Sequence, residues 1–373
     1  MIESNIGARV KTLRENAHMG QEELASVLGL ENRQSVSDIE RGKRRLTADE
    51  LVAIVDHFKV SFENLTNPFL LSTKESFSWR QREVPLAALD EFEARAGEWI
   101  GAYRELNRLN DTKLRKLLPR LGLTQLSVFD DAVEAGEALA DELELGERPA
   151  LALAKTLEDR LGMLVLMVDA IDGVSGAACR LNLLNAILIN RRESEARRNS
   201  DLAHEFFHIL TWDRMRPERV ESAVEAWDAS APTQSQRRNR RIENLADNFA
   251  SGLLMPSREL DRIGDPHGDP VVWLTAAASE LGVSARGLKW RLVNSRRHPR
   301  LSAISNQDLD QAARQRGNQP MPPLFSRNFI ATIVKAIEGG HLSAARAARL
   351  TDLSKSELGE LCSTYELERP TEL

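Results

Sequence analysis

The sequence predicts a mostly α protein, with an all-α head at the N-terminus, an α+β core containing a small three-stranded sheet, and a helical C-terminal part. Apolar residues recur at helical spacing over residues 6–65, which predicts the head. Three short apolar runs within residues 162–190 predict the sheet. The run His-Glu-Phe-Phe-His at 204–208 and a later amphipathic segment predict two facing helices.

Composition limits the classes of function. With 373 residues, the chain is long enough for two or more domains with cores of their own. A net charge of −6 argues against nonspecific coating of nucleic acid or membrane. Cys179 and Cys362 form neither a CxxC motif nor a metal-spaced pair, which is typical of reduced thiols. No apolar run approaches 18 residues and the first four residues are not a signal peptide, so we expect a soluble, cytoplasmic protein with no membrane contact.

The head contains two helical segments separated by a turn. The first covers residues 21–30 and ends near Gly29, and the second begins at Arg33. Residues 1–70 hold 9 Lys+Arg against 11 Asp+Glu, but residues 33–45 hold five positive residues against two negative. Positive charge is therefore concentrated where DNA would lie, although a helix bundle for protein contacts is the alternative.

Over about 60 residues this head resembles the XRE (Cro/repressor) helix-turn-helix family. The resemblance implies that residues 33–41 form the recognition helix in the major groove. Its N-terminal, outward residues are the candidates for base edges: Arg33, Gln34, Ser37 and Asp38. Phosphate contacts, which orient the protein without reading sequence, are expected from Gln21, Lys43, Arg44 and Arg45. Because one head makes few phosphate contacts, we expect a homodimer on a two-fold operator in double-stranded DNA.

A helical connector at residues 71–130 is expected to precede the core. Three strands are then expected at 162–168, 176–181 and 186–190, because these short runs are apolar. The next segment, with Ser200 as a candidate N-cap, reads as a helix that ends near Pro217. This order of three strands and a helix places the His-Glu-Phe-Phe-His run directly after the sheet.

That run is the strongest chemical signal in the chain. Residues four apart share one helix face, so His204 and His208 can direct two imidazoles at one metal ion. Glu205 stands beside them as the general base for the water at the metal. With 7 His in the chain, chance would produce an HExxH pattern only roughly 0.01 times.

A third protein ligand is expected from the helix at 242–256, where apolar residues recur every four positions. Glu243 and Asp247 share one face of it, and we assign Glu243 as the ligand and Asp247 as the partner of a ligating histidine ring. The rival third ligands are Glu225, Asp228 and His267. Two histidines and a carboxylate suit zinc best, with manganese or iron as alternatives.

The histidine run and the helix at 242–256 together resemble the ImmA/IrrE family of metallopeptidases, whose core is a small zincin fold. The resemblance implies an endopeptidase directed at a regulatory protein, with zinc on His204, His208 and Glu243 and with Glu205 as base. A repressor or antitoxin-like partner is the implied substrate, cleaved in a stress or phage response. The family usually has a small residue before the second histidine, where this chain has Phe207. The insert at 213–241 is long for its position and reads as a lid, a docking segment or a loop.

The expected organisation has six parts. Residues 1–70 form the head, 71–130 the connector and 131–256 the metallopeptidase core. A helical segment that resembles a second helix-turn-helix follows at 257–304, then a linker at 305–326 and short amphipathic helices at 327–373.

Two functions fit this organisation. The first is a DNA-bound regulator that is also a zinc-dependent endopeptidase. The second is a non-proteolytic transcription regulator that uses the zincin fold as a sensor or scaffold. Glu205 favours the first, because a metal sensor needs the histidines but not that carboxylate. The insert at 213–241 and Phe207 favour the second.

Overall fold

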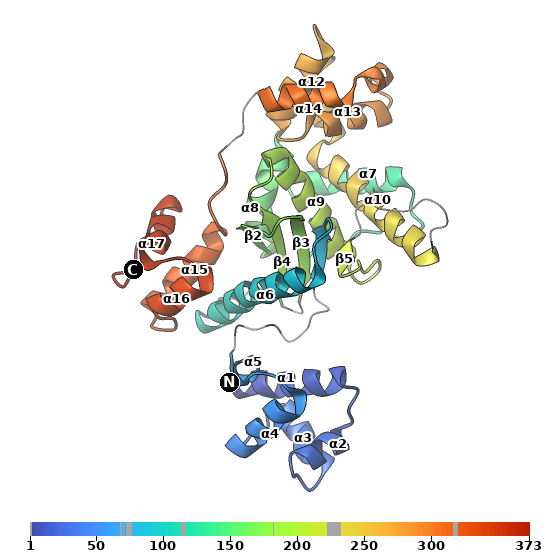
Figure 1. Ribbon diagram of the computed structural model, residues 1–373. Coiled ribbons are helices and arrows are strands. Elements are labelled where there is room, and N and C mark those ends of the chain that lie inside the picture. The colour runs from blue at the N-terminus through green and yellow to red at the C-terminus, as the bar shows by residue number, and fades with distance from the viewer. Residues whose placement is uncertain are drawn as a thin grey trace.

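The computed structural model describes residues 2–67, 69, 71, 77–112, 117–181, 183–221, 233–315 and 320–373. It is mostly helical, with one small sheet at its centre (Figure 1). The N-terminal head lies at one end, and helices α12 to α14 lie at the other (Figure 1). Among the described residues, no helix is both long and apolar enough to cross a membrane.

The head is a bundle of five helices around its own apolar core. Its helices are α1 (Ile2–Asn16), α2 (Gln21–Val27), α3 (Arg33–Glu40), α4 (Ala48–Phe58) and α5 (Phe62–Thr66). The spacing predicted for this region is met, because Leu24, Val36 and Ile54 are fully buried together. Asn32 caps α3 by accepting a hydrogen bond from the Ser35 amide at 3.1 Å.

Phe69, which lies just after the head in sequence, packs closely against α6 (Leu86–Leu109). A Cβ built on Gly101 of α6 would lie only 1.7 Å from the carbonyl oxygen of Phe69. The guanidinium of Arg346 also stacks over the Phe69 ring at 4.5 Å. Only glycine at position 101 permits this approach of the two backbones.

The sheet has five strands in the order β2-β4-β3-β1-β5, two more than expected. The three expected strands are β2 (Leu164–Val168), β3 (Val174–Arg180) and β4 (Asn185–Asn190). β1 (Phe77–Gln81) pairs antiparallel with β3, and the two-residue β5 (Val220–Glu221) pairs parallel with β1. β1 was missed because Trp79, Val84 and Leu86 read as the start of the helical stretch that follows.

Alternation of side chains along the strands separates two apolar layers. Val165, Ala178 and Ile187 face one layer, which contains α9 (Glu195–Thr211) and α8 (Pro149–Leu161). Leu166, Ala177 and Leu188 face the other, which contains α6 and α15 (Arg327–Glu338). α9, which carries His204 and His208, therefore lies on one side of the sheet, and α6 lies on the other.

α10 (Gln234–Leu254) packs against α7 (Phe129–Glu142) at unusually short range. A Cβ on Gly136 would lie 2.3 Å from the Phe249 carbonyl oxygen, and one on Gly252 would lie 2.1 Å from that of Val133. α10 begins well before residue 242, where the apolar pattern starts, because Thr233 and Gln236 form a capping box ahead of a polar first half.

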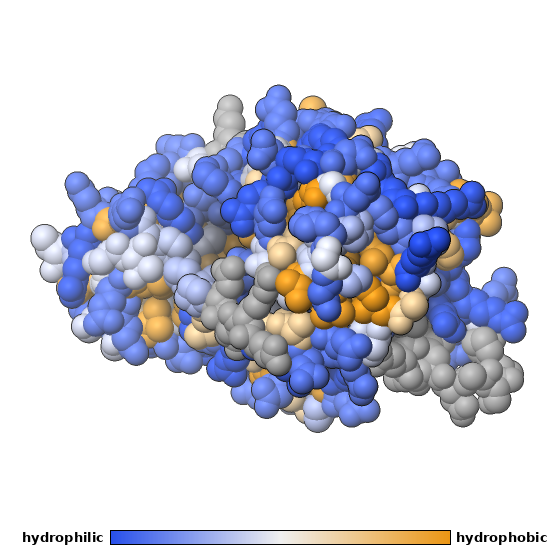
Figure 2. Space-filling view, turned by 90° about the horizontal axis from the view of Figure 1, so that it is seen from above, coloured by the Kyte–Doolittle hydropathy of each residue, from blue (hydrophilic) through white to orange (hydrophobic). Residues whose placement is uncertain are grey.

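The remaining helices follow α10 in sequence. They are α11 (Ser257–Ile263), α12 (Pro270–Leu281), α13 (Ala285–Asn294), η3 (Pro299–Ala303), α14 (Asn306–Gln315), α16 (Ala344–Thr351) and α17 (Lys355–Thr364). α14 lies in the stretch expected to be a linker, where Leu309 is fully buried. Viewed from above, the molecule presents a mainly hydrophilic surface around one apolar area (Figure 2).

Candidate metal centre and nucleic-acid interface

The first two candidate ligands come from α9. This helix begins at Glu195 with Ser194 as its N-cap, whereas the cap was expected at Ser200. His204 and His208 lie on its buried face, with 1% and 0% of their surface exposed. Their rings are 4.8 Å apart between centroids, as expected for residues one helical turn apart.

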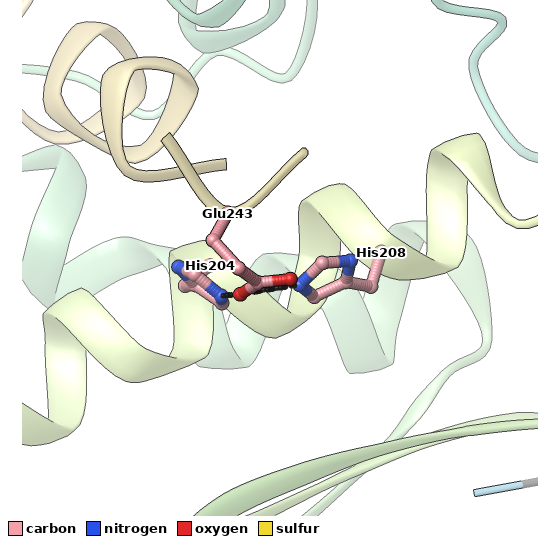
Figure 3. A group of neighbouring side chains, drawn as sticks. All are labelled: His204, His208 and Glu243. Carbon is pink, nitrogen blue, oxygen red and sulfur yellow. Dashed lines mark hydrogen bonds and ion pairs between the residues drawn. The ribbon is translucent and has the colours of Figure 1, made fainter. Parts of the chain in front are cut away.

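Glu243 of α10 completes a triangle of donor atoms (Figure 3). Its Oε2 lies 3.0 Å from His204 Nε2 and 3.6 Å from His208 Nε2. The two Nε2 atoms are 3.1 Å apart. Figure 3 shows all three side chains directed at one point between the helices. The structure thus brings together the three residues that the sequence analysis selected as ligands.

These separations fit a divalent ion such as zinc. Bonds of about 2.0–2.2 Å at tetrahedral angles place donor atoms roughly 3.3–3.6 Å apart. The observed 3.0, 3.1 and 3.6 Å lie close to that range. Two imidazoles and one carboxylate are also the donor set of many zinc centres that leave a fourth position open. In the described part of the chain, no other group of three His, Cys, Asp or Glu comes this close together.

Asp247 contacts His204 at Nδ1, the ring nitrogen that faces away from the donor triangle. Its Oδ1 lies 2.8 Å from His204 Nδ1, on the side of the ring opposite the donor nitrogen. A carboxylate there favours the tautomer that carries its proton on Nδ1, which leaves Nε2 with a lone pair for the metal. This is the position that the sequence analysis gave to Asp247.

The histidines also set the charge state of both acids. Burial alone would raise the pKa of Glu243, but the charge of His208 and the bond with His204 hold it well below the usual range. The Asp247 side chain is 52% exposed, and its hydrogen bond with His204 outweighs the desolvation that acts to raise its pKa, so the pKa is lowered. Both groups are therefore carboxylates at neutral pH, as metal binding and histidine orientation require.

Two charged residues beside the triangle were not foreseen as members of the site. Arg80 of β1 places Nε 3.3 Å from Asp201 Oδ1 and Nη2 3.6 Å from Asp247 Oδ1. Asp201 is fully buried on α9, and burial raises its pKa despite the facing arginines. Its place one turn before His204 was a usable signal, whereas nothing in the sequence connects Arg80 to α9.

Glu205 and Phe207 lie on other faces of α9. Glu205 is fully buried, and its Cγ is 3.7 Å from the position of a Cβ built on Gly176 of β3. Phe207 packs its ring 5.5 Å from Phe249 in the apolar layer with α10. The bulky residue before His208 therefore fills the core between the helices.

Of the rival third ligands, only His267 lies among the described residues, and it is not part of the triangle. His267 is exposed, and its Nδ1 lies 3.3 Å from the Asp265 carbonyl oxygen. Glu225 and Asp228 lie outside the described residues, as do residues 222–232 of the insert expected at 213–241.

The expected DNA-binding residues fall into two groups. Arg33, Gln34, Lys43 and Arg45 are exposed on or just after α3. Two expected phosphate ligands instead bond within the head: Gln21 donates to Glu40 at 2.8 Å and Arg44 binds Glu50 at 2.7 Å.

The last two candidates lie along α3. Asp38 accepts a hydrogen bond from Gln34 at 3.1 Å. The structure corrects the expected outward position of Ser37, which is 9% exposed. It belongs to the buried residues of α3, together with Val36, Ile39 and Glu40.

Two family models match the chain. A helix-turn-helix model matches residues 10–65, and the peptidase family M78 model, described as an IrrE N-terminal-like domain, matches residues 159–292. The chain joins a helix-turn-helix domain to an IrrE N-terminal-like domain. The second match spans β2 to α13 and so includes all three residues of the donor triangle.

Solved structures give fainter likenesses. The apo form of the competence regulator ComR from Streptococcus vestibularis is 13% identical, over 85% of this chain and 98% of ComR, with a TM-score of 0.17. Bacillus thuringiensis PlcR in complex with the peptide PapR7 and DNA is 10% identical, over 97% of this chain and 93% of PlcR, with a TM-score of 0.18. At these TM-scores neither likeness supports an inference about this chain. Among curated proteins, none matches it.

Proposed function

We propose that this protein is a DNA-binding transcription regulator whose IrrE-like domain is a zinc-dependent endopeptidase, with manganese as the alternative metal. The observation that carries the proposal is the donor triangle of His204, His208 and Glu243, with Glu205 next to His204 on the same helix. A divalent ion bound there supplies the Lewis acidity that activates water and polarises a peptide carbonyl.

The residues around the triangle have separate tasks in this proposal. Glu205 accepts a proton from the attacking water at a carboxylate oxygen and passes it to the leaving amine nitrogen, so that water is added across the C–N bond. Asp247 keeps the proton of His204 on Nδ1. The substrate in this proposal is a repressor or antitoxin-like protein, whose loss would release the genes that it controls in a stress or phage response.

The head brings this activity to an operator. In the proposal α3 enters the major groove of double-stranded DNA, where Arg33 and Gln34 read base edges and Lys43 and Arg45 contact phosphates. One such head buries too little surface for tight specific binding, so the protein acts as a homodimer on a two-fold site.

A substitution of Glu205 tests the enzyme. Glu205→Gln removes the base and none of the three donors, so zinc and DNA binding should persist while cleavage of a co-expressed repressor falls about 10²–10⁴-fold. Glu195→Gln, at the start of the same helix, is the matched control and should cleave normally. Cleavage at the wild-type rate by Glu205→Gln would rule out the proposed base.

The alternative is a regulator that binds metal without proteolysis. It is favoured by the burial of His204, Glu205 and His208, each at most 1% exposed, because a peptide must reach these groups to be cut. If the zinc-loaded protein cuts neither itself nor any repressor encoded beside it, and still binds its operator, this second function is the correct one.

A further inference from the structure

Arg80 connects three parts of the metal centre that are distant in sequence. It lies on β1, directly opposite Gly176 of β3 in the antiparallel register. Directly opposite residues present their side chains on the same face of a sheet. Because Gly176 has no side chain, that face has room for both the Arg80 guanidinium and the Glu205 side chain.

The guanidinium joins the two helices that supply the donors. Asp201 of α9 and Asp247 of α10 each place Oδ1 within 3.6 Å of an Arg80 nitrogen. The same Oδ1 of Asp247 lies 2.8 Å from His204 Nδ1, so one carboxylate oxygen serves both the arginine and the histidine. The positive charge of Arg80 thus favours the position of that Asp247 oxygen beside His204 Nδ1, through an ion pair at 3.6 Å.

The charges around the centre give a second reason to connect Arg80 with it. Four carboxylates surround the centre: Asp201, Glu205, Glu243 and Asp247. Arg80 and Arg197, whose Nε lies 2.9 Å from Asp201 Oδ2, supply two positive charges. Arg80 therefore offsets part of the negative charge that these carboxylates bring to the centre.

We propose that Arg80 is a positioning residue of the metal centre, which acts through Asp247 to hold the His204 ring with Nε2 directed at the ion. This inference rests on the proposed metal site. It adds a residue on a strand that precedes the matched IrrE-like region, which starts at residue 159.

Zinc affinity, measured by competition with a chromophoric chelator, tests the proposal without any substrate. Arg80→Met keeps the length of the side chain and removes its charge, and it should weaken zinc binding about 10–100-fold. Arg80→Lys, with one donor group in place of a fork, should recover part of that loss. Arg82→Met removes an exposed arginine two residues further along and should leave the affinity unchanged.

A double-mutant cycle identifies the route. If Arg80 acts through Asp247, Arg80→Met should cost little further affinity in an Asp247→Asn background. Imidazole nitrogen NMR should show a single Nδ1–H tautomer for His204 in the wild type and a mixture in Arg80→Met. Equal losses in both backgrounds, or an unchanged affinity and tautomer in Arg80→Met, would overturn the proposal.

Two further outcomes are separable. If Arg80→Met does not fold, the same cycle is run with Arg80→Lys, whose smaller loss must likewise vanish beside Asp247→Asn. A wild-type protein that binds zinc but cleaves nothing contradicts the proposed peptidase and leaves the role of Arg80 intact. A wild-type protein that binds no zinc contradicts both.

Discussion

Gly136 of α7 and Gly252 of α10 lie against each other: a Cβ built on Gly136 would come within 3.1 Å of the Gly252 carbonyl carbon. This contact sets how closely α10 approaches the rest of the core. α10 carries both Glu243 and Asp247, so the contact also affects the position of Glu243, the third corner of the donor triangle.

We therefore expect Gly252→Ala to push α10 away from α7. The new methyl group would lie 2.1 Å from the Val133 carbonyl oxygen, and overpacking of this kind costs about 1–3 kcal/mol. Urea denaturation should show the lower free energy of unfolding, and zinc affinity should fall with it. Gly122→Ala is the control, since nothing lies within 4 Å of its Cβ position. Equal stability of both variants would contradict the close contact.

Glu158 makes stability depend on pH. Burial of this α8 carboxyl raises its pKa to about 7, although it accepts hydrogen bonds from Ser326 Oγ at 2.7 Å and the Val165 amide at 3.3 Å. Because the pKa of Glu158 is higher in the folded protein than in the unfolded chain, its contribution to stability is fully present below about pH 4.5. That contribution is lost as the pH rises through about 7.

The expected loss is about 2 kcal/mol in the free energy of unfolding between pH 5 and pH 8. Glu158→Gln keeps an acceptor without a charge and should remove this slope in denaturation curves taken at several pH values. Glu147→Gln, at an exposed position, should retain it. A slope that persists in Glu158→Gln would assign the effect to another group.

Zinc should stabilise the folded protein. An ion present at 100 times its dissociation constant adds about 2.7 kcal/mol, because it binds only the folded donor triangle. Thermal unfolding with zinc and with EDTA should differ accordingly in the wild type and not in His208→Ala. His267→Ala removes an exposed histidine outside the triangle and should behave as the wild type does. A zinc shift that survives in His208→Ala would place the ion elsewhere.

Substitutions in the head should distinguish the residues that read base sequence from those that bind phosphates. Arg33→Ala with Gln34→Ala should reduce the preference for the operator over random DNA, because both side chains are exposed on the expected reading face of α3. Lys43→Ala should weaken binding to both DNAs alike and lower the slope of log affinity against log salt by about 0.9. Footprints and salt titrations would measure this, and an unchanged preference in the double variant would remove α3 from the reading face.

Local patterns made much of the site predictable. His204 and His208 are one turn apart on a single helix, and Glu243 and Asp247 are one turn apart on another, so the sequence spacing alone placed each pair on one face. The family resemblance related the two helices to each other. Helix capping by Ser194 was missed because the polar turn before Ser200 has no apolar period.

Contacts between distant segments could not be predicted in this way. Arg80 reaches Asp247 only because β1 pairs with β3, and a five-residue strand followed by a long helix leaves little periodic signal. Gln21 and Arg44 were expected at phosphates from their charge or polarity, yet each has an acidic partner brought close by the packing of the head. Tertiary pairing decided these positions.

The close contact between the Phe69 carbonyl and Gly101 has a consequence for the spacing of operator half-sites that the protein binds. A DNA-binding head joined by a flexible linker can rotate freely and bind half-sites at many separations. Here Phe69, close after the head in sequence, is held against α6 and Arg346, so the two heads of the proposed homodimer would have a narrow range of separations. Operators with a base pair inserted or deleted between their halves should then bind poorly.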